Sequence, residues 1–171
     1  MRGNPLDEVL LGFKKNGFGA GKYTGIGGKV EAGETIVSAA VRELEEETGV
    51  KAIEHNLQYA GHLTFMFPSK PDWSQVVHVF RVIAWEGIPM ESDEVKPIWV
   101  KVTQLPLEQM WQDAHHWLPG ILNGKSVRMR FVFNNDNETI HEIHQEIFST
   151  DQKVHNYSTS WIFEGDQQWK K

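Results

Sequence analysis

The sequence GKVEAGETIVSAAVRELEEETGV at residues 28–50 carries the strongest pattern in the chain. Its apolar residues recur at helical spacing, so we expect a helix from Thr35 to Thr48. On this helix Glu43, Glu46 and Glu47 stand at positions i, i+3 and i+4, so their three carboxylates share one face. The stretch therefore predicts a helix with concentrated negative charge on one side.

The same helix also has an apolar face. Val37, Ala40, Val41 and Leu44 lie about 110° around the helix axis from the carboxylates, which gives the helix a face to bury. Gly49 follows the last turn, where a glycine in the left-handed conformation commonly ends a helix. One element is thus expected to supply part of the core and to carry the acidic side chains.

The acidic face has two interpretations. A solvated helix surface is the common case for glutamate-rich helices, but like charges at these spacings repel, and a bound cation explains why they are grouped. Oxygen ligands without Cys or His suit Mg²⁺, with Mn²⁺ as the alternative. The preceding stretch, residues 25–29, is rich in glycine and lets the backbone approach a metal or phosphate. It is not a P-loop, because Val30 follows Lys29 where a P-loop has Ser or Thr.

Length and composition indicate one compact domain. The chain has 171 residues, a net charge of -6 and a pI near 5.7, which argues against binding long nucleic acids. It contains no cysteine, so it has no disulfides and no thiolate zinc site. The N-terminus lacks the apolar segment of a signal peptide, and no apolar run approaches the roughly 18 residues of a membrane helix. We expect a cytoplasmic monomer whose partner is a small molecule.

Strand-like runs surround two helical segments, which predicts a single α+β domain. The second helical segment spans Leu107 to Leu122, and Pro119 should break or end it. The last two strands should form a hairpin around residues 134–137. The expected strands are Val9–Phe13, Tyr59–Phe67, Val76–Ala84, Ile98–Val102, Val127–Phe133 and Thr139–Ile147.

The glycine at 28, the glutamate at 34 and the run RELEEETGV at 42–50 resemble the signature of the Nudix hydrolase superfamily at every position. The resemblance implies the Nudix fold, an α/β/α sandwich around a mixed, curled β-sheet. It also implies an enzyme that uses a divalent metal to hydrolyse a nucleoside diphosphate linked to another group. In this pattern Arg42 orients the neighbouring glutamates. The metal ligands implied by the resemblance are the carbonyl oxygen of Gly27 and the carboxylates of Glu43, Glu46, Glu47 and Glu94.

A narrower resemblance covers roughly Val9 to Ile147. The segments Gly17–Gly21, His78–Phe80, Glu91–Glu94 and Met110–Trp111 are similar to the oxidised purine nucleoside triphosphate hydrolases. Members of that branch cleave damaged purine nucleotides such as 8-oxo-dGTP and 2-oxo-dATP to the monophosphate and pyrophosphate. The substrate-binding residues implied by this resemblance are Lys14, Phe18, Thr24, Phe65, Trp111, Asp113 and Trp117.

The expected chemistry is attack of water on a phosphorus of the triphosphate, with metal ions neutralising charge on the phosphoryl oxygens. Glu47 or Glu94 would take the proton from that water, and the sequence leaves this choice open. Glu43 and Arg42 complete the expected catalytic group.

Two departures from the branch bear on the substrate. Thr24 stands where the branch has an asparagine that bonds the purine edge, and Ala114 replaces the second of two adjacent aspartates. Fewer polar groups should give narrower or different base selectivity. Two alternatives therefore stay open: hydrolysis of an undamaged dNTP, ADP-ribose or a dinucleoside polyphosphate, and a nucleotide-binding module without activity.

A third departure concerns the N-terminus. Family members carry an apolar strand before the one at Val9, and this chain has only a short polar stretch there. Either the sheet lacks that strand, or the segment from Tyr157 to Phe163 takes its place. We expect residues 1–147 to form the Nudix domain, and residues 148–171 to be a partly ordered C-terminal extension.

Overall fold

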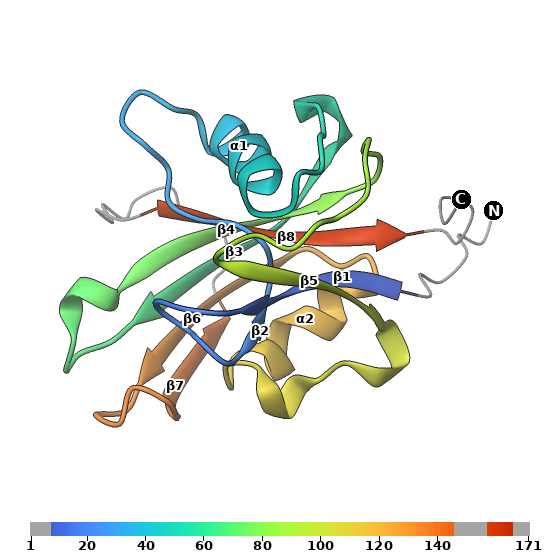
Figure 1. The fold of residues 1–171 in the computed structure, drawn as a ribbon. Coiled ribbons are helices and arrows are strands. Elements are labelled where there is room, and N and C mark those ends of the chain that lie inside the picture. Colours follow the sequence, from blue (N-terminus) through green and yellow to red (C-terminus); the bar gives the residue numbers. More distant parts are fainter. Residues whose placement is uncertain (1–7, 146–156, 166–171) are drawn as a thin grey trace.

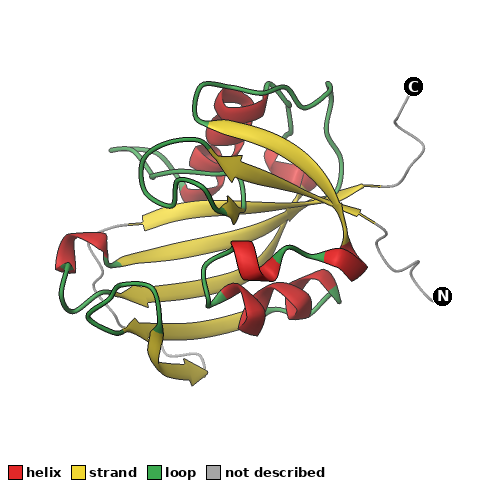
Figure 2. Cartoon of the chain, turned by 60° about the horizontal axis from the view of Figure 1, so that its bottom comes forward, coloured by secondary structure: helices red, strands yellow, loops and turns green. Residues whose placement is uncertain are grey.

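A computed structural model describes residues 8–145 and 157–165 of the chain. At its centre is an eight-stranded mixed β-sheet. Helix α1, Ile36–Thr48, lies on one face of the sheet and helix α2, Ala114–Leu122, lies on the other (Figure 1). Figure 2 shows the same layers from another side, with the strands between the helices. This α/β/α sandwich confirms the fold class predicted from the sequence.

The strands pair in the order β2-β1-β8-β4-β3-β6-β7, and β5 also pairs with β1. Most neighbours are antiparallel, whereas β3 with β6 and β4 with β8 are parallel. All six predicted strands are present. The strand Val127–Phe133 has the predicted bounds, the others begin or end at different residues, and the predicted end of the last strand, residues 146–147, lies outside the described residues. The strands are β1 Glu8–Lys14, β2 Tyr23–Thr24, β3 Leu57–Met66, β4 Gln75–Val82, β5 Val95–Lys101, β6 Val127–Phe133, β7 Ile140–Gln145 and β8 Tyr157–Gly165.

Helix α1 begins and ends where the sequence predicts. The Thr35 hydroxyl accepts the N–H of Ser38 at 3.0 Å, and the Ser38 hydroxyl accepts the N–H of Thr35 at 2.9 Å, which completes a capping box. Gly49 has a φ of 70°, the left-handed conformation expected at a helix end. Ala40 and Leu44 are fully buried. The apolar face of α1 is therefore anchored in the core, which fixes the direction of its acidic face.

The C-terminal segment supplies a strand inside the sheet, beside β1. Strand β8 lies between β1 and β4, and so the second of the two alternatives holds. It pairs in parallel with β4 over residues 157–163 and antiparallel with residues 8–10 of β1. The rest of the expected extension, residues 148–156 and 166–171, lies outside the described residues. The domain boundary after residue 147 stays a prediction.

The second helix differs from the prediction of one helical segment from Leu107 to Leu122. A 3₁₀ turn at Leu107–Gln109 comes first, and α2 starts only at Ala114. The prediction that Pro119 breaks or ends the helix is wrong, because α2 continues past it. Leu118 is fully buried, and this packing outweighs the single helical hydrogen bond that a proline removes.

An opening in the sheet beside β1 positions the functional residues. Residues 8–10 of β1 pair with β8, while residues 12–13 of the same strand pair with β2. Strand β8 therefore joins β1 to β4 only near the start of β1. Beyond that point, side chains from both faces of the sheet can line a common pocket.

Apolar residues pack on both faces of the sheet. The cluster beside α2 includes Leu63, Leu118 and Phe131, and the cluster beside α1 includes Leu10 and Leu44.

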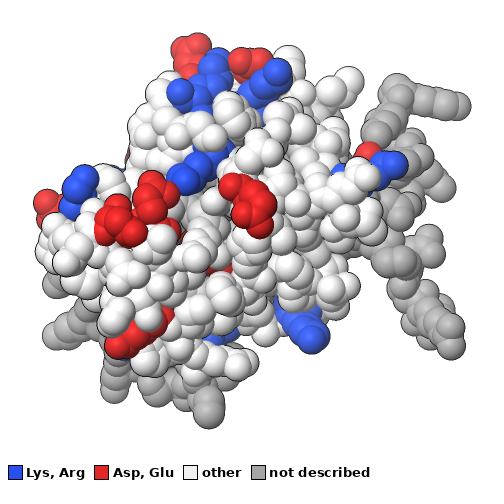
Figure 3. Space-filling view, turned by 90° about the horizontal axis from the view of Figure 1, so that it is seen from below, with Lys and Arg blue, Asp and Glu red and all other residues white. Residues whose placement is uncertain are grey.

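On the α2 side, Lys and Arg occur in small separate groups among Asp and Glu (Figure 3). None of the helices in the described part of the chain has the length and apolar character needed to cross a membrane.

Candidate active site

A pocket of about 600 Å³ is lined by α1, the glycine-rich loop before it, α2 and strands of the sheet. Every residue that the sequence predicted for catalysis, metal binding or substrate binding lines this pocket. The structure thus brings together positions that are far apart in the chain, while their individual roles stay predictions. These residues are Lys14, Phe18, Thr24, Gly27, Arg42, Glu43, Glu46, Glu47, Phe65, Glu94, Trp111, Asp113 and Trp117.

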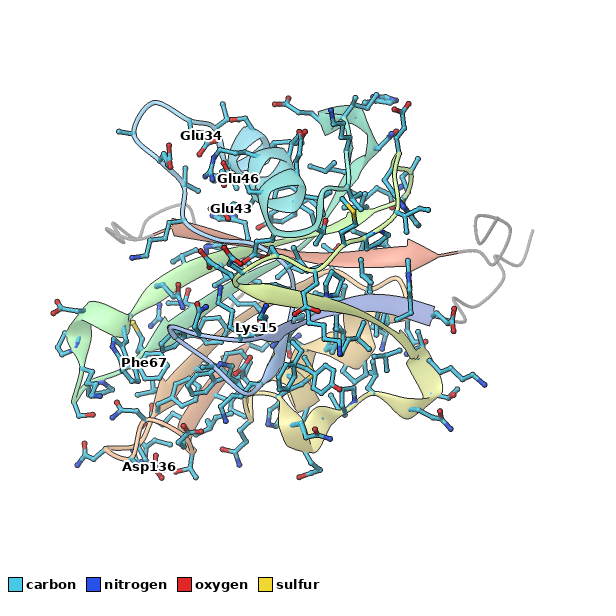
Figure 4. All side chains as sticks on the ribbon, viewed as in Figure 1. Lys15, Glu34, Glu43, Glu46, Phe67 and Asp136 are labelled. Atoms are coloured by element: carbon cyan, nitrogen blue, oxygen red, sulfur yellow. The ribbon has the colours of Figure 1, made fainter. Side chains whose placement is uncertain are left out.

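Arg42 holds three carboxylates together, and two of them, Glu43 and Glu46, line one end of the pocket. Its Nη1 donates to Glu43 Oε1 at 3.0 Å and to Glu46 Oε2 at 2.9 Å. Its Nε donates to Glu34 Oε1 at 2.9 Å and its Nη2 to the Lys29 carbonyl at 3.0 Å. Hydrogen bonding to Glu34 and the other glutamates raises the pKa of Arg42 further above its ordinary value. Figure 4 shows Glu34, Glu43 and Glu46 together on the side of α1 that faces the loop. This geometry is what an orienting role for Arg42 requires.

Glu47 is the most buried glutamate of the acidic face, with 6% of its surface exposed. Its Oε2 accepts the N–H of Gly27 at 2.9 Å, and its Oε1 accepts from Lys14 Nζ at 3.3 Å. Burial raises the pKa of Glu47, although the Gly27 N–H and Lys14 oppose this. Lys14 Nζ also contacts Glu94 at 2.9 Å, so it connects the two candidate bases. Burial lowers the pKa of Lys14, but Glu94 and Glu47 outweigh burial and leave it raised.

Gly28 makes room for Glu43. A Cβ atom at position 28 would lie 2.3 Å from Glu43 Oε1, closer than any real contact. Only glycine allows this carboxylate to lie against the loop. Burial raises the pKa of Glu43, and Arg42 partly offsets the effect. The loop and the helix are therefore matched in shape, with a carboxylate of raised pKa between them.

The donor groups at this end fit a divalent cation in their chemistry. The predicted ligands are all oxygen atoms, and burial, with a smaller contribution from neighbouring carboxylates, raises the pKa of Glu43 and Glu47. In the described residues, no three His, Asp or Glu side chains already form a group that could hold a metal ion. The carboxylates pair with Lys14 and Arg42 instead. The ligand set therefore stays a prediction.

Aromatic rings form the other end of the pocket. Phe18 stacks on Trp111 with ring centroids 5.1 Å apart and an interplanar angle of 18°. Phe67 stacks on Phe133 at 4.4 Å, and Phe65 on Phe131 at 5.6 Å. Phe18 is 44% exposed, so its ring is available at the mouth of the pocket. Flat rings at this end suit a flat heteroaromatic ligand.

Asp113 places a buried carboxyl beside these rings. Its surface is 4% exposed, and its Oδ2 accepts the indole N–H of Trp117 at 2.7 Å. Burial raises the pKa of Asp113 to about 6, and the Trp117 hydrogen bond only partly counteracts this. Ala114 also lines the pocket but carries no polar group there. Asp113 is thus a buried titratable group at the aromatic end.

Several lining residues were missed by the sequence analysis. Phe67, Phe133, Gln75 and Asn16 line the pocket, and none was predicted as a site residue. Strand alternation places Phe67 and Gln75 on the face that carries Phe65, and this signal could have found them once Phe65 was assigned. Asn16 lies in a loop and gave no such signal.

The geometry defines a class of site. One end gathers carboxylates, a lysine and glycine backbone, as hydrolysis of a phosphate anhydride with metal requires. The other end offers aromatic rings and a buried carboxyl, which suit a nucleobase. The two ends belong to one pocket, so the site is that of a hydrolase acting on a small nucleotide.

Comparisons with known proteins identify the family. A model of the NUDIX domain matches residues 3–121, so the chain belongs to the Nudix family. It is 42% identical over 133 residues to the oxidized purine nucleoside triphosphate hydrolase of Mus musculus, covering 78% of this chain and 83% of that protein. It is 45% identical over 126 residues to the protein of the same name from Danio rerio, covering 74% and 79%.

A solved structure supports the same assignment at the level of the fold. The MutT protein from Bacillus halodurans superposes with a TM-score of 0.67 at 26% sequence identity. The match covers 81% of this chain and 89% of that protein. The Nudix fold predicted from residues 28–50 is therefore confirmed.

Proposed function

We propose that this chain hydrolyses oxidised purine nucleoside triphosphates of the 8-oxo-dGTP and 2-oxo-dATP type to the monophosphate and pyrophosphate, and so removes damaged nucleotides from the nucleotide pool. The observation that carries the proposal is the shared pocket of about 600 Å³, in which the acidic face of α1 and the aromatic end with Asp113 meet. The similarity to two proteins named for this activity supports it.

The triphosphate end is assigned to the residues around α1. The Gly27 carbonyl and the carboxylates of Glu43, Glu46, Glu47 and Glu94 would hold divalent metal, and we propose Mg²⁺, with Mn²⁺ able to replace it. When bound, the metal supplies positive charge that neutralises the phosphoryl oxygens.

The residues of the chain itself position the reaction. Water attacks a phosphorus of the triphosphate, the anhydride bond between the α and β phosphates breaks, and Glu47 or Glu94 takes the proton from the water. Arg42 keeps Glu43 and Glu46 in place through the contacts described above. Lys14 lies between the two candidate bases, within reach of an anionic substrate in the same pocket.

The base end is assigned to the aromatic residues and Asp113. Phe18, Phe65, Trp111 and Trp117 supply apolar and aromatic surface for a purine, and each such stack contributes about 1 to 3 kcal/mol. Asp113 would bond the edge of the base, with Thr24 as a further polar group on the wall.

A small substrate fits the charge of the molecule better than a polymer does. The net charge is -6, and basic residues on the face in Figure 3 are scattered rather than banded. We accordingly propose a cytoplasmic monomer that binds free nucleotides and no long nucleic acid.

A second candidate keeps the chemistry and changes the substrate. Ala114 leaves Asp113 as the buried carboxyl at the aromatic end of the pocket, which favours a base with fewer polar contacts, as in hydrolysis of an undamaged dNTP. ADP-ribose and dinucleoside polyphosphates belong to the same candidate. A non-catalytic module is disfavoured because all the glutamates of the signature are present.

The test is a panel of kcat/KM values for 8-oxo-dGTP, 2-oxo-dATP, dGTP, dATP and ADP-ribose with Mg²⁺. The proposal predicts at least about tenfold preference for an oxidised purine, the discrimination that one or two base contacts supply. The proposal would be contradicted if kcat/KM for dGTP and dATP equalled the values for the oxidised nucleotides. The highest kcat/KM for ADP-ribose would support the second candidate. Chelation of the metal should abolish turnover on every substrate.

A further inference from the structure

The turn at residues 91–94 brings Glu94, one of the two candidate bases, to the pocket. The ladder between β1 and β5 ends at the pair Lys14 and Val95, so the turn lies just outside the paired part of the sheet. The Glu94 side chain is 62% exposed, and burial therefore does little to fix its carboxylate. Where this carboxylate lies depends on how the backbone of the turn is held.

Lys15, the first residue after β1, contacts three residues of this turn. Its Nζ donates to Glu91 Oε1 at 2.9 Å and to the Ser92 carbonyl at 2.9 Å. Its backbone N–H donates to the Glu94 carbonyl at 2.8 Å. Lys15 therefore continues the attachment of the turn to β1 beyond the last pair of the ladder.

Asn16 completes the attachment, but its place in the molecule differs from that of Lys15. Asn16 Nδ2 donates to the Asp93 carbonyl at 3.0 Å, so every residue of the turn contacts this loop. Asn16 also lines the pocket, where a substrate can touch it. Lys15 is not among the described residues that line the pocket, so an effect of its side chain on hydrolysis has to pass through the turn.

The contacts of the Lys15 side chain fix a position more than they stabilise the fold. The Lys15 and Glu91 side chains are 36% and 50% exposed, and exposed ion pairs contribute little to the free energy of unfolding. Two donations from one ammonium nevertheless determine where the turn lies relative to β1, which also carries Lys14. Lys14 Nζ in turn contacts Glu94 and Glu47, so a displaced turn would separate the two candidate bases.

We infer that Lys15 is a positioning residue for the hydrolysis: it holds the turn at residues 91–94 so that the Glu94 carboxylate stays beside Lys14 and Glu47. Lys15 acts through Glu94 and does not touch the substrate. The inference rests on the proposed function, because the place of Glu94 matters only if the pocket hydrolyses a nucleotide. It adds a residue for which the sequence predicted no role.

The experiment is a double-mutant cycle on kcat between Lys15 and Glu94, measured with the nucleotide of the panel that has the highest kcat/KM. Lys15→Met keeps the length of the side chain and removes the ammonium. It should lower kcat about tenfold and change KM less than about twofold, as when a partner that orients a functional carboxylate is lost. In the Glu94→Gln background the same change should lower kcat no further, because the carboxylate that Lys15 positions is already gone.

Two more variants separate the contacts of Lys15 from its charge and from a general loss of structure. Lys15→Arg keeps N–H donors for Glu91 and Ser92, and it should retain most of the wild-type kcat. Lys96→Met is the matched control, because Lys96 is an exposed lysine of β5 beside the turn and its charge also acts on Glu91. Its kcat should match the wild type. Thermal unfolding of each variant shows that the changes in kcat belong to folded protein.

The outcomes keep the role of Lys15 apart from the proposed function. The role of Lys15 is overturned if Lys15→Met keeps the wild-type kcat, if Lys96→Met lowers kcat equally, or if Lys15→Met lowers kcat by the same factor in the Glu94→Gln background. If Glu94→Gln has no measurable turnover, Lys15→Arg decides, and a kcat as low as that of Lys15→Met overturns the role. A preferred substrate other than an oxidised purine refutes the proposed function alone, and a wild type without turnover on the whole panel refutes both.

Discussion

Asp113 is buried, and burial raises the pKa of its carboxyl from 3.8 to about 6. The fold therefore disfavours the ionised form of Asp113. The resulting loss of free energy of unfolding is absent below pH 3.8, grows between pH 3.8 and pH 6, and reaches about 3 kcal/mol above pH 6. Asp113→Asn should accordingly raise the melting temperature at pH 8 and change it little at pH 4, because the amide oxygen can still accept the Trp117 N–H. Thermal unfolding at the two pH values measures the difference.

The matched control is Asp72→Asn, in an exposed turn between β3 and β4. This variant removes an exposed carboxyl and should change the melting temperature little. If Asp113→Asn stabilised the protein equally at pH 4 and pH 8, its carboxyl would not be the buried titratable group described here.

Gly28 supports a prediction about the acidic end. In Gly28→Ala the new Cβ would overlap the Glu43 carboxylate, so that side chain must move. We expect turnover to fall at least about tenfold, as when groups that position metal ligands are disturbed. Gly120→Ala is the control, because a Cβ there meets only Val127 Cγ1 at an ordinary 3.7 Å. Retained activity in Gly28→Ala would show that the place of Glu43 against the loop has no catalytic importance.

Single residues differed in how far the sequence could predict them. Glu43, Glu46 and Glu47 follow from spacing on one helix, which is local information. Gln75 could not be assigned, because its place in the pocket depends on the register of β3 with β4 and on the position of α2. Asp113 was assigned from resemblance, but its burial and its bond to Trp117 come only from the fold.

On the scale of elements, α1 acts as one rigid carrier of carboxylates, and Arg42 connects them. Arg42→Lys keeps the positive charge, but one ammonium cannot bond Glu34, Glu43 and Glu46 together as the planar guanidinium does. We expect kcat to fall about 10- to 100-fold with the fold retained. Steady-state kinetics with thermal unfolding measures both effects.

Lys51→Gln controls for the loss of a cation beside α1. Lys51 Nζ lies 3.3 Å from Glu45 Oε1 at the protein surface, and such exposed ion pairs contribute little to stability. Its kcat should match the wild type. An unchanged kcat in Arg42→Lys would rule out an orienting role for the guanidinium.

The ends of α1 were predictable because its capping signals are local: Thr35 and Ser38 at the start, Gly49 after the end. The course of α2 was not. Pro119 is a local signal to stop, and packing of the buried side of α2 against the sheet overrides it. Local signals thus predicted the ends of α1, which carries the acidic residues. They failed for α2, whose course depends on tertiary contacts.

On the scale of the whole molecule, β8 holds the sheet together. It lies between β1 and β4 and pairs with both, so its removal leaves two strands without their common neighbour. We expect a chain ending at Gln145 to lose cooperative thermal unfolding, since the exposed strand edges have nothing to pair with. A chain ending at Gly165 keeps β8 and should unfold like the full protein. Cooperative unfolding of the shorter chain would support an independent domain ending near residue 147.

The placement of this strand shows a limit of sequence reasoning. From the sequence, Tyr157–Phe163 was one candidate for a strand beside β1. Nothing local distinguishes a strand that joins the sheet from an apolar patch in a tail. Its pairing depends on β1 and β4, which are far away in the chain.

Release of pyrophosphate from 8-oxo-dGTP with Mg²⁺, by the wild type and by Glu47→Gln, is the most direct measurement of the central claim. Glu47 lies on the acidic face of α1 and is buried against Gly27. Glu47→Gln keeps the size of this side chain and removes its charge. The account predicts rapid release by the wild type and nearly none by Glu47→Gln, with 8-oxo-dGMP still bound by the folded variant. Undiminished release by Glu47→Gln, or none by the wild type, would contradict it.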